Sequence, residues 1–143
     1  GLLTVLHAAD RERLLRSWAW LIGSRCHALM TTGFGDVFFW NEETQAVSFL
    51  DVQHGGAEFV DTDVMWFLDE FLSTPEVIAK VLREPLLQEL VSRRRALKYG
   101  EVYVLEPWQL LGGQEHPDRF DIAACDVYVD LVAQTLRPRD GAL

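Results

Sequence analysis

The middle of the chain contains two short apolar runs separated by a polar segment. Residues 36–40 and 46–51 are rich in aromatic and β-branched side chains, and the polar residues 41–44 separate them. This arrangement predicts the two strands of an antiparallel hairpin. Gly55-Gly56 supplies a turn after the second strand, so we expect a third short strand at residues 57–60.

The clearest helical pattern follows this region. Apolar residues recur at positions i, i+3, i+4, i+7 and i+8, namely Val64, Phe67, Leu68, Phe71 and Leu72. Asp61 is placed to cap the free amides at the start of the helix, while Asp63, Asp69 and Glu70 lie off the apolar face. The pattern predicts an amphipathic helix that packs on the sheet through that face.

An earlier helix is expected at residues 9–21. Leu14, Leu15 and Trp18 are spaced along it with helical periodicity, and Gly23 follows as a stop signal.

The second half of the chain continues the mixture of helices and strands. Thr74 is expected to cap a helical stretch with Pro75 in its first turn, and Pro85 breaks or restarts this stretch before Gly100 ends it. After it we expect a central strand at residues 101–105, a loop at 108–117, a short strand at 119–123 and a terminal helix at 126–136. The pattern predicts one α+β domain over residues 1–143, in which an antiparallel hairpin-based sheet packs against several helices.

The apolar face of each element supplies a list of core residues. We expect burial of Trp18, Phe38, Phe67, Phe71 and Leu131. The terminal helix should bury Val127, Leu131, Val132 and Leu136.

The charge balance limits the partners of the chain. Thirteen Lys and Arg stand against 22 Asp and Glu, giving a net charge of −9. Phosphate backbones are poor partners for such a chain, and we interpret the short basic cluster Arg93-Arg94-Arg95 with Lys98 as a solvated helix face. An acidic protein is attracted to a basic protein partner, which speeds their encounter.

The remaining composition favours a reducing compartment and gives no sign of a membrane segment. Cys26 and Cys125 lie far apart in apolar surroundings, so we expect buried free thiols. The apolar runs are too short to span a bilayer, and no leader pattern points to secretion. Gly1 stands where a starting methionine would, so we expect further residues upstream in the native protein.

Candidate chemistry was sought among the glycines, acids and histidines. Gly33-Phe34-Gly35 lacks the third glycine of a dinucleotide fingerprint and is interpreted as a sharp turn into the first strand. Asp36, Asp51 and His54 lie near strand ends, where they could converge as metal ligands or as an acid–base group, but their spacing matches no metal signature. No serine or histidine lies in a catalytic motif. The sequence therefore predicts no catalytic site, metal site or cofactor.

The order of several sequence blocks resembles one known family. The blocks are Ser17–Leu21, Thr32–Trp40, Phe49–Val52 with Gly55, Gly100–Tyr103, Pro107–Gly113 and Leu131–Gln134. Together they resemble the C-terminal domain of the type VI secretion DNase-immunity proteins, a bacterial family long carried as a domain of unknown function. The resemblance covers residues 14–136 and depends mainly on the G-F-G-D-x-F-F-W and L-G-G blocks.

The resemblance implies a fold and a function. Family members studied as immunity proteins are cytosolic, are encoded beside a toxic nuclease and neutralise it by binding. The family is also similar in layout to the Smi/Knr-type immunity domains. The shared glycines and aromatics are what a scaffold needs, so they transfer the architecture more securely than the activity. Residues 30–56 are accordingly interpreted as scaffold.

Three hypotheses about function follow. The first is a non-enzymatic, cytoplasmic binding protein that neutralises a cognate basic nuclease toxin and binds neither nucleic acid nor membrane. Its expected partner-binding residues are Asp61, Asp63, Glu70, Trp108, Glu115 and Asp118. The second is a small hydrolase or metal-dependent enzyme, which requires Asp36, Asp51 and His54 to meet in a polar cleft. The third is a regulatory scaffold domain without a toxin partner, which the neighbouring gene would distinguish from the first.

Overall fold

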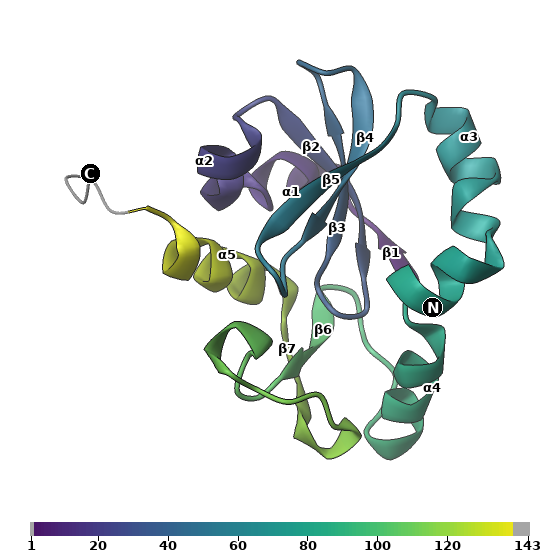
Figure 1. Ribbon diagram of the computed structural model, residues 1–143, viewed down its shortest axis with the longest axis vertical. Helices are drawn as coiled ribbons and strands as arrows, with labels where there is room; N and C mark the ends of the chain where they lie inside the picture. The colour runs from purple at the N-terminus through teal and green to yellow at the C-terminus, as the bar shows by residue number, and fades with distance from the viewer. Residues whose placement is uncertain (1, 139–143) are drawn as a thin grey trace.

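The computed structural model describes residues 2–138, which form two antiparallel sheets and several helices (Figure 1). The strands are β1 (Leu3–Val5), β2 (Cys26–Thr32), β3 (Val37–Asn41), β4 (Ala46–Asp51), β5 (Gly56–Asp61), β6 (Glu101–Leu105) and β7 (Phe120–Ala124). The helices are α1 (Ala8–Arg13), α2 (Ala19–Ile22), α3 (Val64–Asp69), α4 (Glu84–Arg93) and α5 (Cys125–Leu136). Single 3₁₀ turns occur at Arg16–Trp18, Phe71–Ser73, Gln109–Leu111 and Pro117–Arg119, and a π-helical turn at Val77–Val81. None of the described helices is long and apolar enough to cross a membrane.

The larger sheet has the strand order β1-β2-β3-β4-β5, and every neighbouring pair is antiparallel. The predicted hairpin is confirmed as β3 and β4, with Val37 opposite Leu50 and Asn41 opposite Ala46. The predicted third strand is confirmed as β5, which forms one edge of the sheet. The fold class is therefore α+β, as the sequence predicts.

Helices cover both faces of this sheet because β3 and β4 alternate their side chains between two cores. Val37, Phe39 and Leu50 pack with Trp18 and with α5, whereas Phe38 and Val47 pack with α3 and the residues after it. Figure 1 shows α3 on one side of the sheet and α2 and α5 on the other. Burial on both faces explains why β3 is apolar at nearly every position.

The strand predicted at residues 101–105 forms as β6, but its predicted place at the centre of a sheet is wrong. β6 pairs only with β7, in a separate two-stranded sheet. The amide of Tyr103 donates to the carbonyl of Gly33 (2.8 Å), which connects this small sheet to the turn before β3. Phe34 from the same turn packs against Phe120 and the residues of α4.

The glycines of that turn serve the scaffold, as the sequence suggests. Gly35 has a φ of +86°, and a Cβ at this position would lie 2.8 Å from the Tyr128 ring. A Cβ on Gly33 would lie 2.5 Å from Leu87. The turn therefore requires glycine for its backbone conformation and for its close approach to α4 and α5.

The helix predicted over residues 9–21 is shorter and broken in the structure. α1 ends at Arg13, and α2 starts at Ala19 after a 3₁₀ turn. This break lets Trp18 turn inward, where its indole nitrogen donates to the carbonyl of Val129 (2.9 Å). β1 and β2 are not predicted from the sequence. For β2 the reason is that Leu29 and Met30 are good helix formers, and its pairing with β1 and β3 defines it as a strand.

The amphipathic helix is confirmed as α3, with two corrections. Its cap is Asp63, whose side chain accepts from the amide of Trp66 (3.1 Å), whereas Asp61 accepts from the amide of Asp63 one turn earlier. Phe67 is fully buried, but Leu68, predicted on the buried face, is 40 % exposed.

The stretch after α3 also departs from the prediction at one cap. The hydroxyl of Thr74 donates back to the carbonyl of Glu70 (3.0 Å) and does not cap the following turn. Pro85 does lie in the first turn of a new helix, α4, as expected.

The terminal helix is confirmed as α5, but it is rotated relative to the prediction. Val132 is fully buried and Leu136 is partly buried against the same core. Val127 and Leu131 are 55 % and 45 % exposed, so the prediction of their burial is wrong. α5 instead packs through residues one position along the chain, which are Cys125, Tyr128, Val129, Val132 and Ala133.

The other expected core residues are largely confirmed. Trp18, Phe38 and Phe67 are fully buried, and Phe71 is half-buried against the Phe38–Phe67 cluster. Cys26 and Cys125 are both free and buried.

Candidate functional site

Negative charge is concentrated in one part of the chain. Residues 26–79 contain no Lys or Arg. They contain Asp36, Glu42, Glu43, Asp51, Glu58, Asp61, Asp63, Asp69, Glu70 and Glu76. This segment alone therefore carries more negative charge than the net −9 of the whole chain.

Four of these acids lie together in sequence at the end of β5 and along α3. We call Asp61, Asp63, Asp69 and Glu70 the acidic face. Asp61 is half-buried and the other three are exposed. None of the four takes part in an ion pair within residues 2–138. Their charge is therefore available to a partner.

The acids at the two ends of α3 have different effects on the helix. Asp63 caps the first turn, where the helix dipole favours negative charge. Asp69 and Glu70 lie at the last turn, which contains no basic residue. Negative charge at that end opposes the dipole, so these two carboxylates do not stabilise the helix on which they lie.

Apolar side chains lie among these acids. Because Phe67 points into the core, its neighbours on α3 point outward, and Met65 and Trp66 are 63 % and 41 % exposed. The ring of Trp66 lies 5.8 Å from that of Phe71, which supports it from one side. The acidic face therefore has an apolar centre with a partly fixed aromatic ring.

This arrangement is suited to binding a protein. Interfaces combine an apolar centre, in which Trp and Met are enriched, with a polar rim. Tryptophan is also enriched among the few residues that supply most of the binding energy. Sequence reasoning found three acids of this face but gave Met65 and Trp66 no role. Two features of the sequence could have indicated Met65 and Trp66. They lie in the segment without Lys or Arg, and they lie off the predicted apolar face of α3.

The other acids predicted to bind a partner lie elsewhere, in the loop before β7. Glu115 forms an ion pair with Arg83. Asp118 pairs with Arg93 (2.6 Å) and lies 3.6 Å from the ring of His116. The structure thus does not join them to the acidic face, and their charge is partly neutralised by neighbours.

Trp108 lies in an apolar groove on a different part of the molecule. It is half-buried, and its ring meets the ring of Tyr128 edge-on at 5.8 Å. The groove has a volume of about 330 Å³ and includes the exposed Leu111, Val127 and Leu131. Trp108 therefore contributes to packing and also to an accessible apolar surface.

Asp36, the first member of the enzyme hypothesis, is part of a buried network. Its Oδ1 accepts from the amide of Val52 (2.9 Å), and its Oδ2 accepts from Nε2 of Gln53 (3.0 Å). Burial, with a further contribution from the charge of Asp51, raises the pKa of Asp36 to about 7, although the hydrogen bonds from Gln53 and Val52 oppose this change. The Oε1 of Gln53 accepts from Arg83 (3.1 Å).

Arg83 connects this network to the rest of the fold. Its φ of +57° is unusual for a residue other than glycine, and its guanidinium lies 4.6 Å from the centre of the Phe34 ring. Through Gln53 and Glu115 it links the turn after β4 to the loop before β7. These contacts hold the strained backbone at the start of α4.

The structure does not bring the three residues of the enzyme hypothesis into one cleft. Asp51 and His54 form a separate pair at the end of β4 (Oδ2 to Nδ1, 2.8 Å), and the His54 ring is exposed. Asp36 is only 3 % exposed and faces the backbone of Val52. Within residues 2–138, no three His, Cys, Asp or Glu side chains are arranged to hold a metal ion.

The basic cluster Arg93-Arg94-Arg95 with Lys98 begins at the last residue of α4, and its arginines pair with neighbouring acids. Arg93 pairs with Glu89 as well as Asp118, and Arg95 forms a two-pronged pair with Glu101. The guanidinium of Arg95 and the amide of Lys98 together lower the pKa of Glu101 to about 2. The cluster was predicted on a helix face, but α4 ends at Arg93, so Arg94, Arg95 and Lys98 lie in the segment after it and this part of the prediction is wrong.

Comparisons with known proteins were made on sequence and on structure. The model of a family described as T6SS immunity protein Tdi1, C-terminal, matches residues 63–135, just over half of the chain. The match includes α3 and the L-G-G block but begins after the G-F-G-D block. No curated protein matches the chain. Among solved structures, Atu4351 from Agrobacterium tumefaciens has a similar fold, with a TM-score of 0.66 at 14 % identity over 94 % of this chain and 67 % of that one.

Proposed function

The chain belongs to the family of type VI secretion system immunity proteins described as T6SS immunity protein Tdi1, C-terminal, and from this premise we propose that it neutralises a cognate secreted nuclease by binding it directly. The acidic face with its apolar centre at Met65 and Trp66 is the proposed binding surface. The protein acts in this proposal as a stoichiometric inhibitor without catalysis.

One observation carries the choice of surface. Asp61, Asp63, Asp69 and Glu70 lie within ten residues of one another, have no ion-pair partner within residues 2–138, and flank the exposed Met65 and Trp66 in the sequence. A nuclease needs a basic surface to bind the phosphate backbone. Unpaired carboxylates attract such a surface and compete with the nucleic acid for it.

The apolar centre supplies what charge alone does not. Exposed ion pairs contribute at most about 1 kcal/mol each, because solvent screens them. Burying Trp66 against a partner removes a large apolar area from water and fixes the register of the complex. Charge thus speeds the encounter, while Trp66 and Met65 slow dissociation.

The proposal of a non-enzymatic role is supported by the separation of Asp36 from the Asp51–His54 pair. A general base needs a cleft in which it reaches its substrate, and Asp36 contacts the amide of Val52 instead. A cytoplasmic location is supported by Cys26 and Cys125, which are both free.

The test is the binding of the nuclease encoded beside this gene. We expect a 1:1 complex, and we expect Trp66→Ala to raise Kd by about 30-fold or more through a faster off-rate. Charge reversal at Asp63 and Glu70 should lower the on-rate, and raising salt should produce the same change in the wild type. Growth of cells that produce the toxin should follow the affinities.

Glu12→Lys is the matched control, because Glu12 is an exposed acid on α1 and lies outside the acidic face. This variant should leave the off-rate unchanged, and it should lower the on-rate only as far as the change in net charge of the protein does. Failure to form any complex would refute neutralisation by direct binding. A tight complex that is indifferent to Trp66→Ala and to the charge reversals would refute only the surface.

A further inference from the structure

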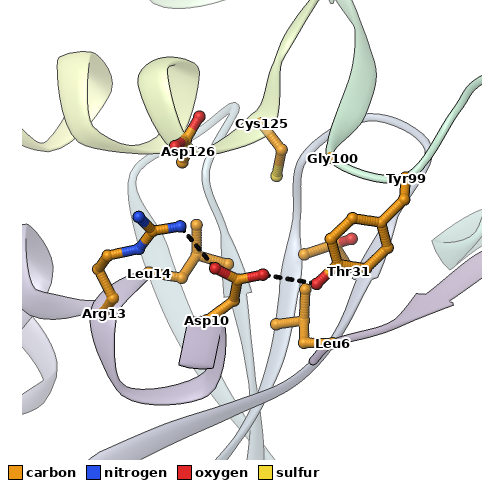
Figure 2. A pocket seen from close by; sticks show the side chains of 9 residues that line it. All are labelled: Leu6, Asp10, Arg13, Leu14, Thr31, Tyr99, Gly100, Cys125 and Asp126. Atoms are coloured by element: carbon orange, nitrogen blue, oxygen red, sulfur yellow. Dashed lines mark hydrogen bonds and ion pairs between the residues drawn. The ribbon is translucent and has the colours of Figure 1, made fainter. Parts of the chain in front are cut away.

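A pocket of about 220 Å³ opens where four segments meet, on the side of the sheet opposite α3. Figure 2 shows residues 6–14 below it, Tyr99 and Gly100 beside it and the start of α5 above it. The volume exceeds the ~150 Å³ of an engineered protein cavity that binds benzene. A molecule of several carbon atoms therefore fits.

The side wall of this pocket is held by specific contacts. The hydroxyl of Tyr99 donates to Oδ2 of Asp10 (2.7 Å) and accepts from the amide of His7 (2.9 Å). The rings of His7 and Tyr99 stack at 3.9 Å with an angle of 9°. The carbonyl of Gly100 accepts from the amide of Cys125 (2.8 Å), which joins this wall to α5. The opening is thus a built feature of the fold.

Two polar side chains with little exposure lie on the floor of the pocket. Thr31 and Cys125 are 4 % and 5 % exposed and lie beside Leu6 and Leu14. Neither the Thr31 hydroxyl nor the Cys125 thiol makes a hydrogen bond to another part of residues 2–138, and in Figure 2 the sulfur points from α5 towards α1. Among the described residues the fully buried side-chain nitrogen or oxygen without a partner is Trp20 Nε1, so the Thr31 hydroxyl is accessible from the pocket and can bond with a group that enters it.

The rim has a net negative charge. Asp10 and Asp126 carry carboxylates, and Arg13 is the only cation among the lining residues. Arg13 is already bound to Asp10 (2.5 Å), which also accepts from Tyr99. The carboxylate of Asp126 is exposed and forms no ion pair within the described residues. A positive group at the mouth would therefore find its partner in Asp126.

We propose that this pocket binds a small organic cation, with a protonated amine beside Asp126 at the mouth, a short aliphatic chain against Leu6 and Leu14, and a polar tip at the Thr31 hydroxyl. The order of these groups follows the pocket from rim to floor. It also distinguishes a free amino alcohol or similar metabolite from a lysine side chain of a partner protein. An inserted lysine side chain would carry its ammonium past Asp126 to Leu6, Leu14 and Thr31, which have no charge to pair with it.

The test uses four probes that differ by one group at a time: 5-aminopentan-1-ol, pentylamine, pentane-1,5-diol and 5-hydroxypentanoate. Binding is followed by the amide NMR signals of Gly100, Cys125 and Asp126. We expect saturable shifts with 5-aminopentan-1-ol at millimolar concentrations. Pentylamine and the diol should bind about three- to tenfold more weakly, and the carboxylate should not bind measurably.

Two variants assign the groups. In Asp126→Asn the advantage of the amino alcohol over the diol should disappear, and in Thr31→Val its advantage over pentylamine should disappear. Asp69→Asn, on the exposed side of α3, is the control and should preserve the whole order. Equal binding of all four probes, or no saturable shift in the wild type, would overturn the proposal without use of any variant.

Discussion

Replacing Asp36 with asparagine tests the buried network around Arg83, because it should change how the free energy of unfolding depends on pH. Asp36 is almost fully buried, and burial raises its pKa from 3.8 to about 7. The folded protein therefore binds this proton more tightly than the unfolded chain. The contribution of Asp36 to the free energy of unfolding is therefore complete below pH 4, and it is lost as the pH rises through 7. Asparagine has no such titration.

The magnitude follows from the two pKa values. At about 1.4 kcal/mol per pKa unit, the change from 3.8 to about 7 corresponds to about 4 kcal/mol of unfolding free energy over the full titration. Between pH 5 and pH 8 the linkage relation gives about 2.5 kcal/mol of this total. We therefore expect the wild type to lose about 2.5 kcal/mol relative to Asp36→Asn over this interval.

The assay is urea denaturation of both proteins at several values of pH between 5 and 8. Groups that titrate in both proteins, such as the histidines, cancel in the difference. Asp69→Asn, at an exposed carboxylate, should follow the wild type at every pH. A difference that stays constant within about 0.5 kcal/mol would show that Asp36 remains ionised throughout. In that case the positive charge of Arg83, which is hydrogen-bonded to the same Gln53 as Asp36, would lower the pKa of Asp36 more than burial raises it.

Three further predictions concern stability and binding. Phe67→Ala should cost about 3–5 kcal/mol in chemical denaturation, because the ring is fully buried and lies 5.1 Å from that of Phe38; Leu131→Ala should cost less than about 1 kcal/mol, and the reverse order would mean that the packing of α3 or α5 is misassigned. Gly35→Ala should lower the unfolding free energy by about 1–3 kcal/mol, because alanine is strained at a positive φ and its Cβ would press on an aromatic ring; an unchanged thermal midpoint would contradict this. Asp69→Asn should leave stability unchanged or raise it by a few tenths of a kcal/mol while weakening toxin binding in a kinetic assay, and a loss of stability would assign Asp69 to the scaffold.

The sequence predicts those elements whose local pattern is compatible with only one type of secondary structure. The hairpin of β3 and β4 is such a case, because its aromatic runs flank a polar turn that is incompatible with a helix. β2 is the opposite case, since Leu29 and Met30 suit a helix as well as a strand, and pairing with β1 and β3 decides between them. α5 was predicted as a helix, but Val127 and Leu131 form one apolar stripe and Tyr128 and Val132 another. Periodicity does not choose between two such stripes, and the contact with Trp18 and the sheet does.

The candidate site shows the same division. Asp61, Asp63 and Glu70 were predicted from their positions near a helix start and lie on the acidic face. Glu115 was predicted because it flanks the Gly112-Gly113 loop, but it pairs with Arg83, which is 32 positions earlier in the sequence. Whether an acid is free or paired depends on contacts between distant segments. For this reason the sequence identifies acidic residues but does not show which of them keep their charge for a partner.

The position of the acids on α3 gives a physical reason to connect the acidic face with binding. Asp63 caps the start of α3, so its negative charge has a role in the fold. Asp69 and Glu70 have the opposite relation to their helix, because they place two negative charges at its C-terminal end without a basic neighbour in the last turn. Met65 and Trp66 likewise expose apolar area that the core does not use. Native proteins break local rules of this kind mainly where another requirement compensates for the lost stability. Both departures occur on the same short helix, and a basic partner with an apolar recess would satisfy both at once.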